Sequence, residues 1–267
     1  MPHVETIGIQ MYYKEGGSGD PLILIMGITA PGVAWEVHAE HWEQNYRCIM
    51  VDNRGIGKTD KPEGDYTSAM MADDYAGLMD AIGIKAAKVV GVSMGSIIAQ
   101  QLCLRHAEKV KSAVLMCPWA RCDEYAKSIF NHIELTFAHL TPAKFMEWIQ
   151  LLIFAKSFWD NPDSYAGLLE GRAGFAVAPE PQPLVGLVGQ SAACKSHNVV
   201  SELGNISQKC LVIGGKDDIF TPIWMAKEVA GGIPNCDTYL YDNAGHAFHF
   251  EYTEDFNQRV LDWLNAN

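Results

Sequence analysis

The sequence predicts an α/β protein in which a mostly parallel central sheet is flanked by helices and interrupted by a helical insertion. Short, almost fully apolar runs alternate with stretches of helical spacing, which is typical of βαβ units in a parallel sheet covered on both faces. This alternation breaks after Trp119 and resumes at Cys210. A chain of 267 residues is long enough to bury one such core.

The strands and helices of the first half follow one another at regular intervals. Residues 21–27 illustrate the strands, because nearly every side chain is apolar, as in a strand buried on both faces. Gly83 is a suitable C-cap for the second helix. The expected strands are residues 7–13, 21–27, 48–52, 88–92 and 110–117, and the expected helices are residues 33–44, 69–82 and 94–106.

The second half divides into an insertion and a return to the core. Residues 121–200 have helical spacing and no clear buried strand. Strands are expected again at 210–214 and 237–241, and helices at 222–230 and 254–264. We therefore expect an α/β core made of residues 1–120 and 201–267, and a helical insertion made of residues 121–200.

Charge and composition argue against several classes of function. The formal net charge is −12 and no Lys/Arg cluster stands out, which argues against nucleic-acid binding. The most apolar segments are far shorter than the roughly 20 residues that cross a bilayer, and residues 1–6 do not begin a signal peptide. We expect no nucleic-acid or membrane partner, and the oligomeric state stays open.

The seven cysteines indicate a cytoplasmic protein. Their number is odd, they form no C-x-x-C pair, and several lie in apolar runs where a reduced thiol behaves as a small hydrophobic group. A disulfide between Cys117 and Cys122 stays open as an alternative. Nothing in the pattern calls for a metal or an organic cofactor.

The strongest chemical signal is Gly91–Gly95, which fits the pattern G-x-S-x-G around Ser93. This pattern forms the sharp turn that exposes a serine hydroxyl between a strand and a helix, and here an apolar strand ends at Val92 and a helix begins at Met94. The glycines are needed because a Cβ would clash where the backbone segments approach. Ser93 is therefore the candidate nucleophile.

A serine hydroxyl needs a base to accept its proton. We expect His246 to be that base, because it follows the strand at 237–241, and the chain order serine, acid, histidine is the one that accompanies this turn. His249 is the competing residue, but it lies between Phe248 and Phe250 and is interpreted as a packing residue.

The acid that orients the histidine should follow the strand at 210–214. Asp217 and Asp218 are both available, and we favour Asp218, because Thr221 and Pro222 look like the N-cap and first residue of a helix. Two other acidic residues near His246, Asp242 and Glu251, are interpreted as solvated loop charges.

The developing oxyanion requires backbone N–H donors that are already in place. The N–H of Met94, which follows the nucleophile, is one candidate. The N–H of Ile28 is the other, because Gly27 lets the chain after the strand at 21–27 bend close to Ser93.

These landmarks together resemble the α/β-hydrolase superfamily along nearly the whole chain. Residues 52–60 are similar to the family's D-x-R-G-x-G-x-S turn, residues 215–222 to its G-x-x-D-x-x-x-P acid motif, and Gly245 with His246 to its histidine motif. The acid motif independently selects Asp218. Two residues depart from the family pattern: Met26 stands where a histidine is common, and Ser96 where relatives often have a third glycine.

The resemblance implies a serine hydrolase that acts on carboxylic esters or lactones through an acyl-enzyme, and residues 89–110 most resemble small esterases and enol-lactonases. Thioesterase, peptidase and perhydrolase activities share the same triad. The alternatives are a hydrolase of C–C bonds in diketones and a non-hydrolytic small-molecule receptor on the same scaffold.

The resemblance implies that the helical insertion at residues 121–200 is the family's helical cap. Its large aromatic side chains suggest an apolar acyl or alcohol pocket. They either roof this pocket or pack the cap against the core, and we expect packing for more than half of them. They are Phe130, Phe137, Phe145, Trp148, Phe154, Phe158 and Trp159.

Overall fold

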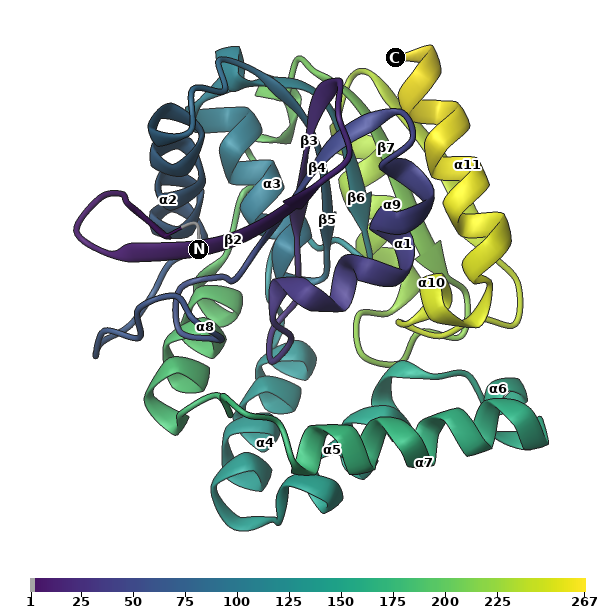
Figure 1. The fold of residues 1–267 in the computed structure, drawn as a ribbon. Coiled ribbons are helices and arrows are strands. Elements are labelled where there is room, and N and C mark those ends of the chain that lie inside the picture. The colour runs from purple at the N-terminus through teal and green to yellow at the C-terminus, as the bar shows by residue number, and fades with distance from the viewer. Residues whose placement is uncertain (1–2) are drawn as a thin grey trace.

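The computed structural model describes residues 3–267 as a sheet with helices on both faces (Figure 1). Residues 1–2, which begin the segment where no signal peptide is expected, lie outside the described residues. None of the helices in residues 3–267 is long and apolar enough to cross a membrane.

The sheet has eight strands in the order β1-β2-β4-β3-β5-β6-β7-β8. The pairs β1–β2 and β2–β4 are antiparallel and the other neighbouring pairs are parallel, so the predicted mostly parallel sheet is confirmed. The strands are β1 (His3–Glu5), β2 (Gln10–Gly16), β3 (Asp20–Ile25), β4 (Tyr46–Val51), β5 (Ala87–Val92), β6 (Val110–Met116), β7 (Lys209–Gly215) and β8 (Cys236–Tyr241).

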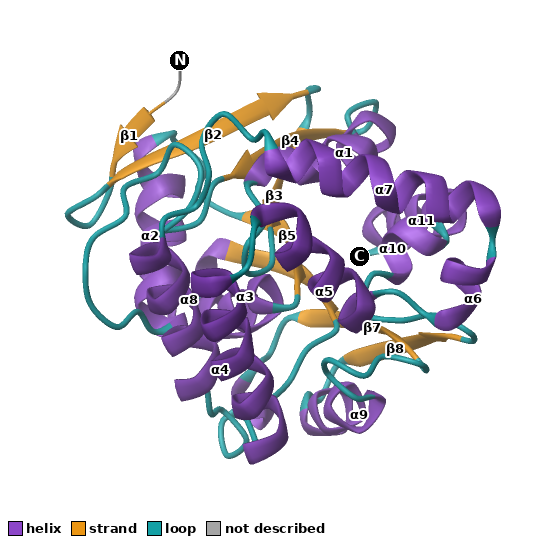
Figure 2. Cartoon of the chain, turned by 90° about the horizontal axis from the view of Figure 1, so that it is seen from below, coloured by secondary structure: helices purple, strands orange, loops and turns teal. Residues whose placement is uncertain are grey.

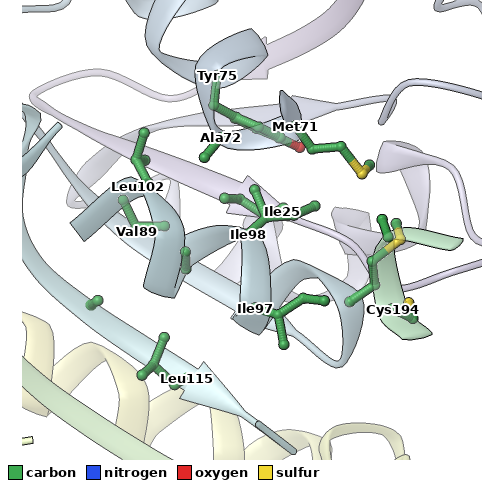
Figure 3. Packing of buried hydrophobic residues seen from close by; sticks show 14 of the residues in the cluster. Ile25, Met71, Ala72, Tyr75, Val89, Ile97, Ile98, Leu102, Leu115 and Cys194 are labelled. Atoms are coloured by element: carbon green, nitrogen blue, oxygen red, sulfur yellow. The ribbon is translucent and has the colours of Figure 1, made fainter. Parts of the chain in front are cut away.

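Alternating side chains of the central strands supply two hydrophobic cores. In β3, Ile23 and Ile25 belong to one core and Leu22 and Leu24 to the other, as the two-residue period of a strand requires. The first core contains α2 (Ser68–Ala81), α3 (Met94–Arg105) and α9 (Ile223–Gly232). Figure 3 shows residues of α2 and α3 packed over Ile25 and Val89 of the sheet.

The second core is closed by helices on the opposite face of the sheet. It contains buried side chains of the 3-10 turn η1 (Gly32–Trp35), α1 (Glu36–Trp42) and α11 (Thr253–Ala266). Three short elements complete the core region: η2 (Ala107–Lys109), η3 (Leu203–Asn205) and α10 (Phe248–Glu251).

Several boundaries differ from the prediction, and at three of them the backbone conformation changes. The expected strand at 7–13 is wrong at its start, because Gly8, with φ +76°, forms a turn between β1 and β2. The expected helix at 33–44 begins with the tighter η1 turn. The expected strand at 110–117 ends at Met116, because Cys117 has φ +49°, which interrupts the extended backbone.

Five helices separate β6 from β7: α4 (Glu124–His139), α5 (Pro142–Ile153), α6 (Lys156–Asp160), α7 (Pro162–Ala176) and α8 (Leu184–Ser196). Three of them begin after a side chain that caps the first turn, namely Asp123, Thr141 and Asn161. Figure 1 shows α4 to α7 below the sheet, and in Figure 2, viewed from below, α5 lies in front of the central strands.

The chain enters and leaves this helical segment through two stretches of backbone that lie side by side. Cys122 N donates to His197 O at 3.2 Å, Val199 N donates to Ala120 O at 2.8 Å, and Arg121 forms an antiparallel bridge with Asn198. We call residues 120–122 and 197–199 the neck. The division into core and cap at residues 121 and 200 stays a proposal.

Candidate active site

Ser93 lies in a strained turn between β5 and α3. Its backbone has φ 54° and ψ −119°, a conformation that side-chain-bearing residues rarely adopt. A Cβ on Gly95 would lie 2.1 Å from Ile25 O, and one on Gly91 would lie 2.3 Å from Gly95 O. Both glycines are therefore required for the close packing that holds Ser93 in this turn.

His246 and Asp218 lie in direct contact. Asp218 Oδ2 is 2.7 Å from His246 Nδ1. The other carboxylate oxygen, Oδ1, accepts backbone N–H groups of Phe220 at 2.8 Å and Thr221 at 2.9 Å. Asp218 is buried, whereas Asp217 is exposed, so the structure brings Asp218 and not Asp217 against the histidine.

Thr221 has a different role from the predicted one. The prediction that it caps a helix is wrong, because α9 begins at Ile223 and its N-cap is Pro222. The Thr221 hydroxyl instead donates to Asp218 Oδ2 at 2.9 Å and lies 3.1 Å from His246 Nδ1. It therefore helps to fix the carboxylate and the imidazole relative to each other.

The two atoms that would exchange a proton are both buried and both free. Among residues 3–267, neither Ser93 Oγ nor His246 Nε2 has a hydrogen-bond partner. Both residues line one cavity of about 230 Å³, which we call the catalytic cavity. Because Ser93 Oγ and His246 Nε2 have no competing hydrogen bond, both atoms are available to a group that enters the cavity.

Of the two residues that carry the candidate oxyanion donors, Ile28 lines this cavity and Met94 directly follows Ser93. Met94 is the first residue of α3, where a backbone N–H has no acceptor within the helix. Ile28 lines the catalytic cavity, and a Cβ on the preceding Gly27 would lie 3.3 Å from Ser93 Cβ. The segment that contains Ile28 therefore passes directly against the nucleophile.

Side chains from two regions hold the Ile28 segment. Asn53 Nδ2 donates to Met26 O at 2.8 Å on one side. On the other side, Gln190 of α8 accepts the N–H of Thr29 at 3.4 Å and donates to Arg54 O at 2.8 Å. Gln190 is fully buried, so the cap helix α8 takes part in positioning this loop.

His249 lies in an aromatic cluster, as predicted for a packing residue. Its ring centroid is 4.3 Å from that of Phe250 and 5.4 Å from that of His38. Burial lowers the pKa of His249 well below its usual value, so the ring is neutral at physiological pH. Its ring also forms part of the wall of the catalytic cavity.

The prediction that Glu251 is a solvated loop charge is wrong. Its Oε1 accepts the N–H of Ala155, which precedes α6, at 2.7 Å, and its Oε2 accepts the N–H of Gly245 at 3.1 Å. Burial raises the pKa of this carboxyl. Ala247 N also donates to Ile153 O at 2.8 Å, so the loop that carries His246 is bound to the cap on both sides of the histidine.

The cap walls of the catalytic cavity are mainly aliphatic. Met146, Ile149 and Ile153, at helical spacing on α5, face it together with Ile133 and Phe175. The aromatic residues singled out from the sequence lie elsewhere: Phe137 and Phe145 line a second cavity, Phe154 and Phe158 a third, and Phe130 packs on Trp119 and Phe220. The apolar face of α5 was the signal that could have identified the pocket.

Cys117, Asp218 and His246 also form a trio of potential metal ligands within 4.8 Å of one another. The donor chemistry is unfavourable for a metal, because burial raises the pKa of the Cys117 thiol well above its usual value and a metal binds the thiolate. Cys117 Sγ instead donates to His246 O at 3.2 Å. Cys117 and Cys122 are both free thiols.

Comparison with known proteins places this arrangement in a family context. The family model described as alpha/beta hydrolase fold matches residues 20–253. The chain is 34% identical to "Putative non-heme bromoperoxidase BpoC" of Mycobacterium tuberculosis over 259 residues, which cover 95% of this chain and 97% of that protein. It is 28% identical to 2-hydroxy-6-oxo-6-phenylhexa-2,4-dienoate hydrolase of Comamonas testosteroni, with 95% of this chain and 91% of that protein covered.

Solved structures show the same fold. The crystal structure of BpoC from Mycobacterium tuberculosis superposes with a TM-score of 0.87 at 31% identity and covers 96% of both chains. The enol-lactonase of Burkholderia xenovorans superposes with a TM-score of 0.88 at 21% identity and covers 99% of this chain and all of that chain, which supports the fold alone.

Proposed function

This chain belongs to the α/β-hydrolase family, and from that premise we propose that it is a serine hydrolase that cleaves carboxylic esters or lactones through an acyl-enzyme. One observation carries the proposal. Ser93 Oγ and His246 Nε2 are unpartnered in a shared apolar cavity, while the opposite ring nitrogen of His246 is held by Asp218.

In the proposed reaction, Ser93 Oγ attacks the ester carbonyl as His246 Nε2 accepts its proton. The N–H groups of Ile28 and Met94 bind the negative charge that develops on the carbonyl oxygen. His246 then returns the proton to the leaving alcohol, which in a lactone stays attached to the acyl group. Water repeats the sequence on the acyl-enzyme and releases the acid, while Asp218 stabilises the imidazolium in both halves.

The substrate class is proposed from the cavity walls. Of its lining residues within 3–267, only Thr29, Ser93, His246 and His249 have polar side chains. A neutral, apolar ester or lactone suits such a wall, because a charged group buried there would lose hydration without gaining a partner.

The relative from Comamonas testosteroni, named as a dienoate hydrolase, supports a second candidate, the hydrolysis of C–C bonds. A dienoate carries a carboxylate, and no lysine or arginine lines the catalytic cavity among the described residues. C–C hydrolysis is therefore less well supported as a proposal than ester hydrolysis. The similarity to BpoC suggests a further assay, in which hydrogen peroxide replaces water on the acyl-enzyme and yields a peracid.

We expect the protein to act in the cytoplasm on a small molecule. The seven cysteines are free and six of them are buried, as is typical of proteins in a reducing compartment.

The decisive experiment is a turnover screen of p-nitrophenyl esters and simple lactones with the native protein and Ser93→Ala. We expect hydrolysis by the native protein and a loss of several orders of magnitude in kcat in a variant that stays folded. Near-normal turnover by Ser93→Ala would exclude Ser93 as nucleophile. Absence of turnover by the native protein on both substrate sets would favour the C–C hydrolase or the receptor.

A further inference from the structure

Three cavities meet at the side chain of Phe175, near the C-terminal end of α7. Phe175 lines the catalytic cavity, a cavity of about 390 Å³ beside the turn between α4 and α5, and a cavity of about 620 Å³ beside α7. Its ring packs against Phe145, with the centroids 6.0 Å apart. We call the cavity beside α7 the α7 groove.

The α7 groove adjoins the catalytic cavity through apolar side chains. Met146, Ile153, Phe175 and Phe250 line both. Methionine is unbranched and adapts its shape more readily than other core side chains. A group that extends from Ser93 in this direction therefore meets apolar side chains, of which Met146 can adapt its shape.

One wall of the groove is a face of α7 that carries three glycines. Gly167, Gly171 and Gly174 occur at spacings of four and three residues, which places them on one face of α7, and all three line the groove. A Cβ on Gly167 or Gly174 would have no tertiary neighbour within 4 Å, and one on Gly171 would lie 3.5 Å from Gln150 Nε2. Glycine is a poor helix former, so helix stability does not account for these residues.

Gln150 and Ser164 are the polar side chains that line the groove among the described residues, and Gln150 is already paired. Gln150 donates to Leu168 O at 2.9 Å and accepts from Arg172 Nε at 2.6 Å. Most of the other groove-lining side chains, such as Phe154, Phe158 and Leu168, are apolar. The groove therefore suits an alkyl chain better than a group that needs hydrogen bonds.

The catalytic cavity alone is small for a substrate. Its volume of about 230 Å³ lies below the roughly 300–1,000 Å³ of common small-molecule sites. At its inner end stands the unpartnered Ser93 hydroxyl, whose residue is only 4% exposed. The two adjoining cavities together provide a reactive end and an apolar extension.

Resting on the proposed ester hydrolysis, we propose that the α7 groove binds a linear alkyl chain of the substrate, which passes Met146 and Phe175 while the ester carbonyl lies at Ser93. The chain belongs to the acyl group or to the alcohol, and the two are distinguished by experiment. Phe175 is then a specificity-determining residue, because it stands where the chain leaves the catalytic cavity.

The test is Gly171→Leu, which fills the groove, with Ala173→Leu as the matched control on an exposed part of the same helix. Hydrolysis is measured for p-nitrophenyl alkanoates and for alkyl acetates of rising chain length. In the native protein we expect kcat/KM to rise by about two- to fourfold per methylene that enters the groove.

For Gly171→Leu, the ratio of kcat/KM for long chains to kcat/KM for short chains should fall at least about tenfold in one of the two series. The series that is affected identifies the side of the ester that occupies the groove. Ala173→Leu should keep the native turnover and chain-length preference, and the Tm of Gly171→Leu should not fall, since leucine is a better helix former than glycine. Phe175→Ala should shift the optimum toward longer or branched chains. Unchanged preference in both series for Gly171→Leu would overturn the proposal.

Failure of the groove and failure of the proposed function give different results. If short esters are hydrolysed but Gly171→Leu keeps the native chain preference, the function stands and the groove proposal is wrong. If no ester is hydrolysed, decan-1-ol tests the groove directly: it should raise the Tm of the native protein and of Ala173→Leu, and not that of Gly171→Leu. Equal shifts in all three proteins would overturn the groove in that case.

Discussion

The core and the cap build opposite walls of one cavity by different means. On the core side, Asp218 accepts four hydrogen bonds and Ser93 is held between two glycines that tolerate no Cβ. On the cap side, aliphatic residues such as Ile149 and Met146 face the cavity through packing alone. Reaction chemistry depends on fixed atom positions, whereas the choice of an apolar substrate depends on shape and on the area buried.

The contrast is not complete, because the cap also holds two core loops. Gln190 accepts the N–H of Thr29, beside the candidate oxyanion donor, and Glu251 joins Ala155 of the cap to Gly245 beside the histidine. A cap that only shaped the pocket would not need these contacts. Substitutions in both regions therefore measure how far the chemistry belongs to the core and how far it depends on the cap.

The largest effect is expected in the core, at Asp218. Asp218→Asn should lower kcat by about 1,000- to 10,000-fold, because an amide neither holds the same histidine tautomer nor stabilises the imidazolium. Asp217→Asn is the matched control and should retain near-native activity, because Asp217 is exposed. Steady-state kinetics on a p-nitrophenyl ester measures both, and a reversal of the two effects would identify Asp217 as the acid.

A substitution of Glu251 tests whether the position of His246 in the core depends on a contact with the cap. Glu251→Ala leaves the N–H groups of Ala155 and Gly245 without their acceptor, and a displaced His246 loop should lower kcat by about 10- to 100-fold. Asp242→Ala changes an exposed acid in the neighbouring turn and should have little effect. If both variants keep native kcat, the cap contact has no part in positioning the histidine.

The pH dependence of stability tests the burial of Glu251 in a second way. Burial raises the pKa of Glu251, so the folded state binds this proton more tightly than the unfolded chain does. Its contribution to the free energy of unfolding should therefore fall as the pH rises through the raised pKa. Glu251→Gln keeps an acceptor oxygen and removes the titration.

Urea unfolding across the range from pH 4 to pH 8 compares the two proteins. The stability of Glu251→Gln relative to the native protein should increase with pH. A difference that stays constant over this range would mean that the carboxyl titrates alike in the folded and unfolded states.

The smallest effects are expected for aromatic residues of the cap. Phe154 lines the α7 groove, so Phe154→Ala should change the preferred ester chain length. Trp159 packs on Tyr165 and Arg172 outside it, and Trp159→Ala should only lower the Tm by a few degrees, or about 1 kcal/mol. Chain-length profiles and thermal unfolding separate the two, and equal profiles would remove Phe154 from the pocket.

The sequence predicts the parts of the site whose signals are local. The strand ending at Val92 and the spacing from Asp218 to Pro222 need only neighbouring residues to be recognised. Glu251 could not be recognised in this way, because one of its partners, Ala155, is 96 residues distant in the chain. The pocket walls were expected among cap aromatics, although the regular apolar face of α5 was available in the sequence.

The neck has a consequence for how the cap can vary. Backbone hydrogen bonds between Cys122 and His197 and between Val199 and Ala120 hold its two sides together, whatever lies between them. The entropy lost in closing a loop between two fixed points rises slowly, by about 0.6 kcal/mol for each doubling of length. Caps of other lengths could be grafted between these points without refolding the sheet, provided that they supply acceptors for the two catalytic loops. Substrate range could then change by exchange of a segment, while the reacting atoms stay where the core holds them.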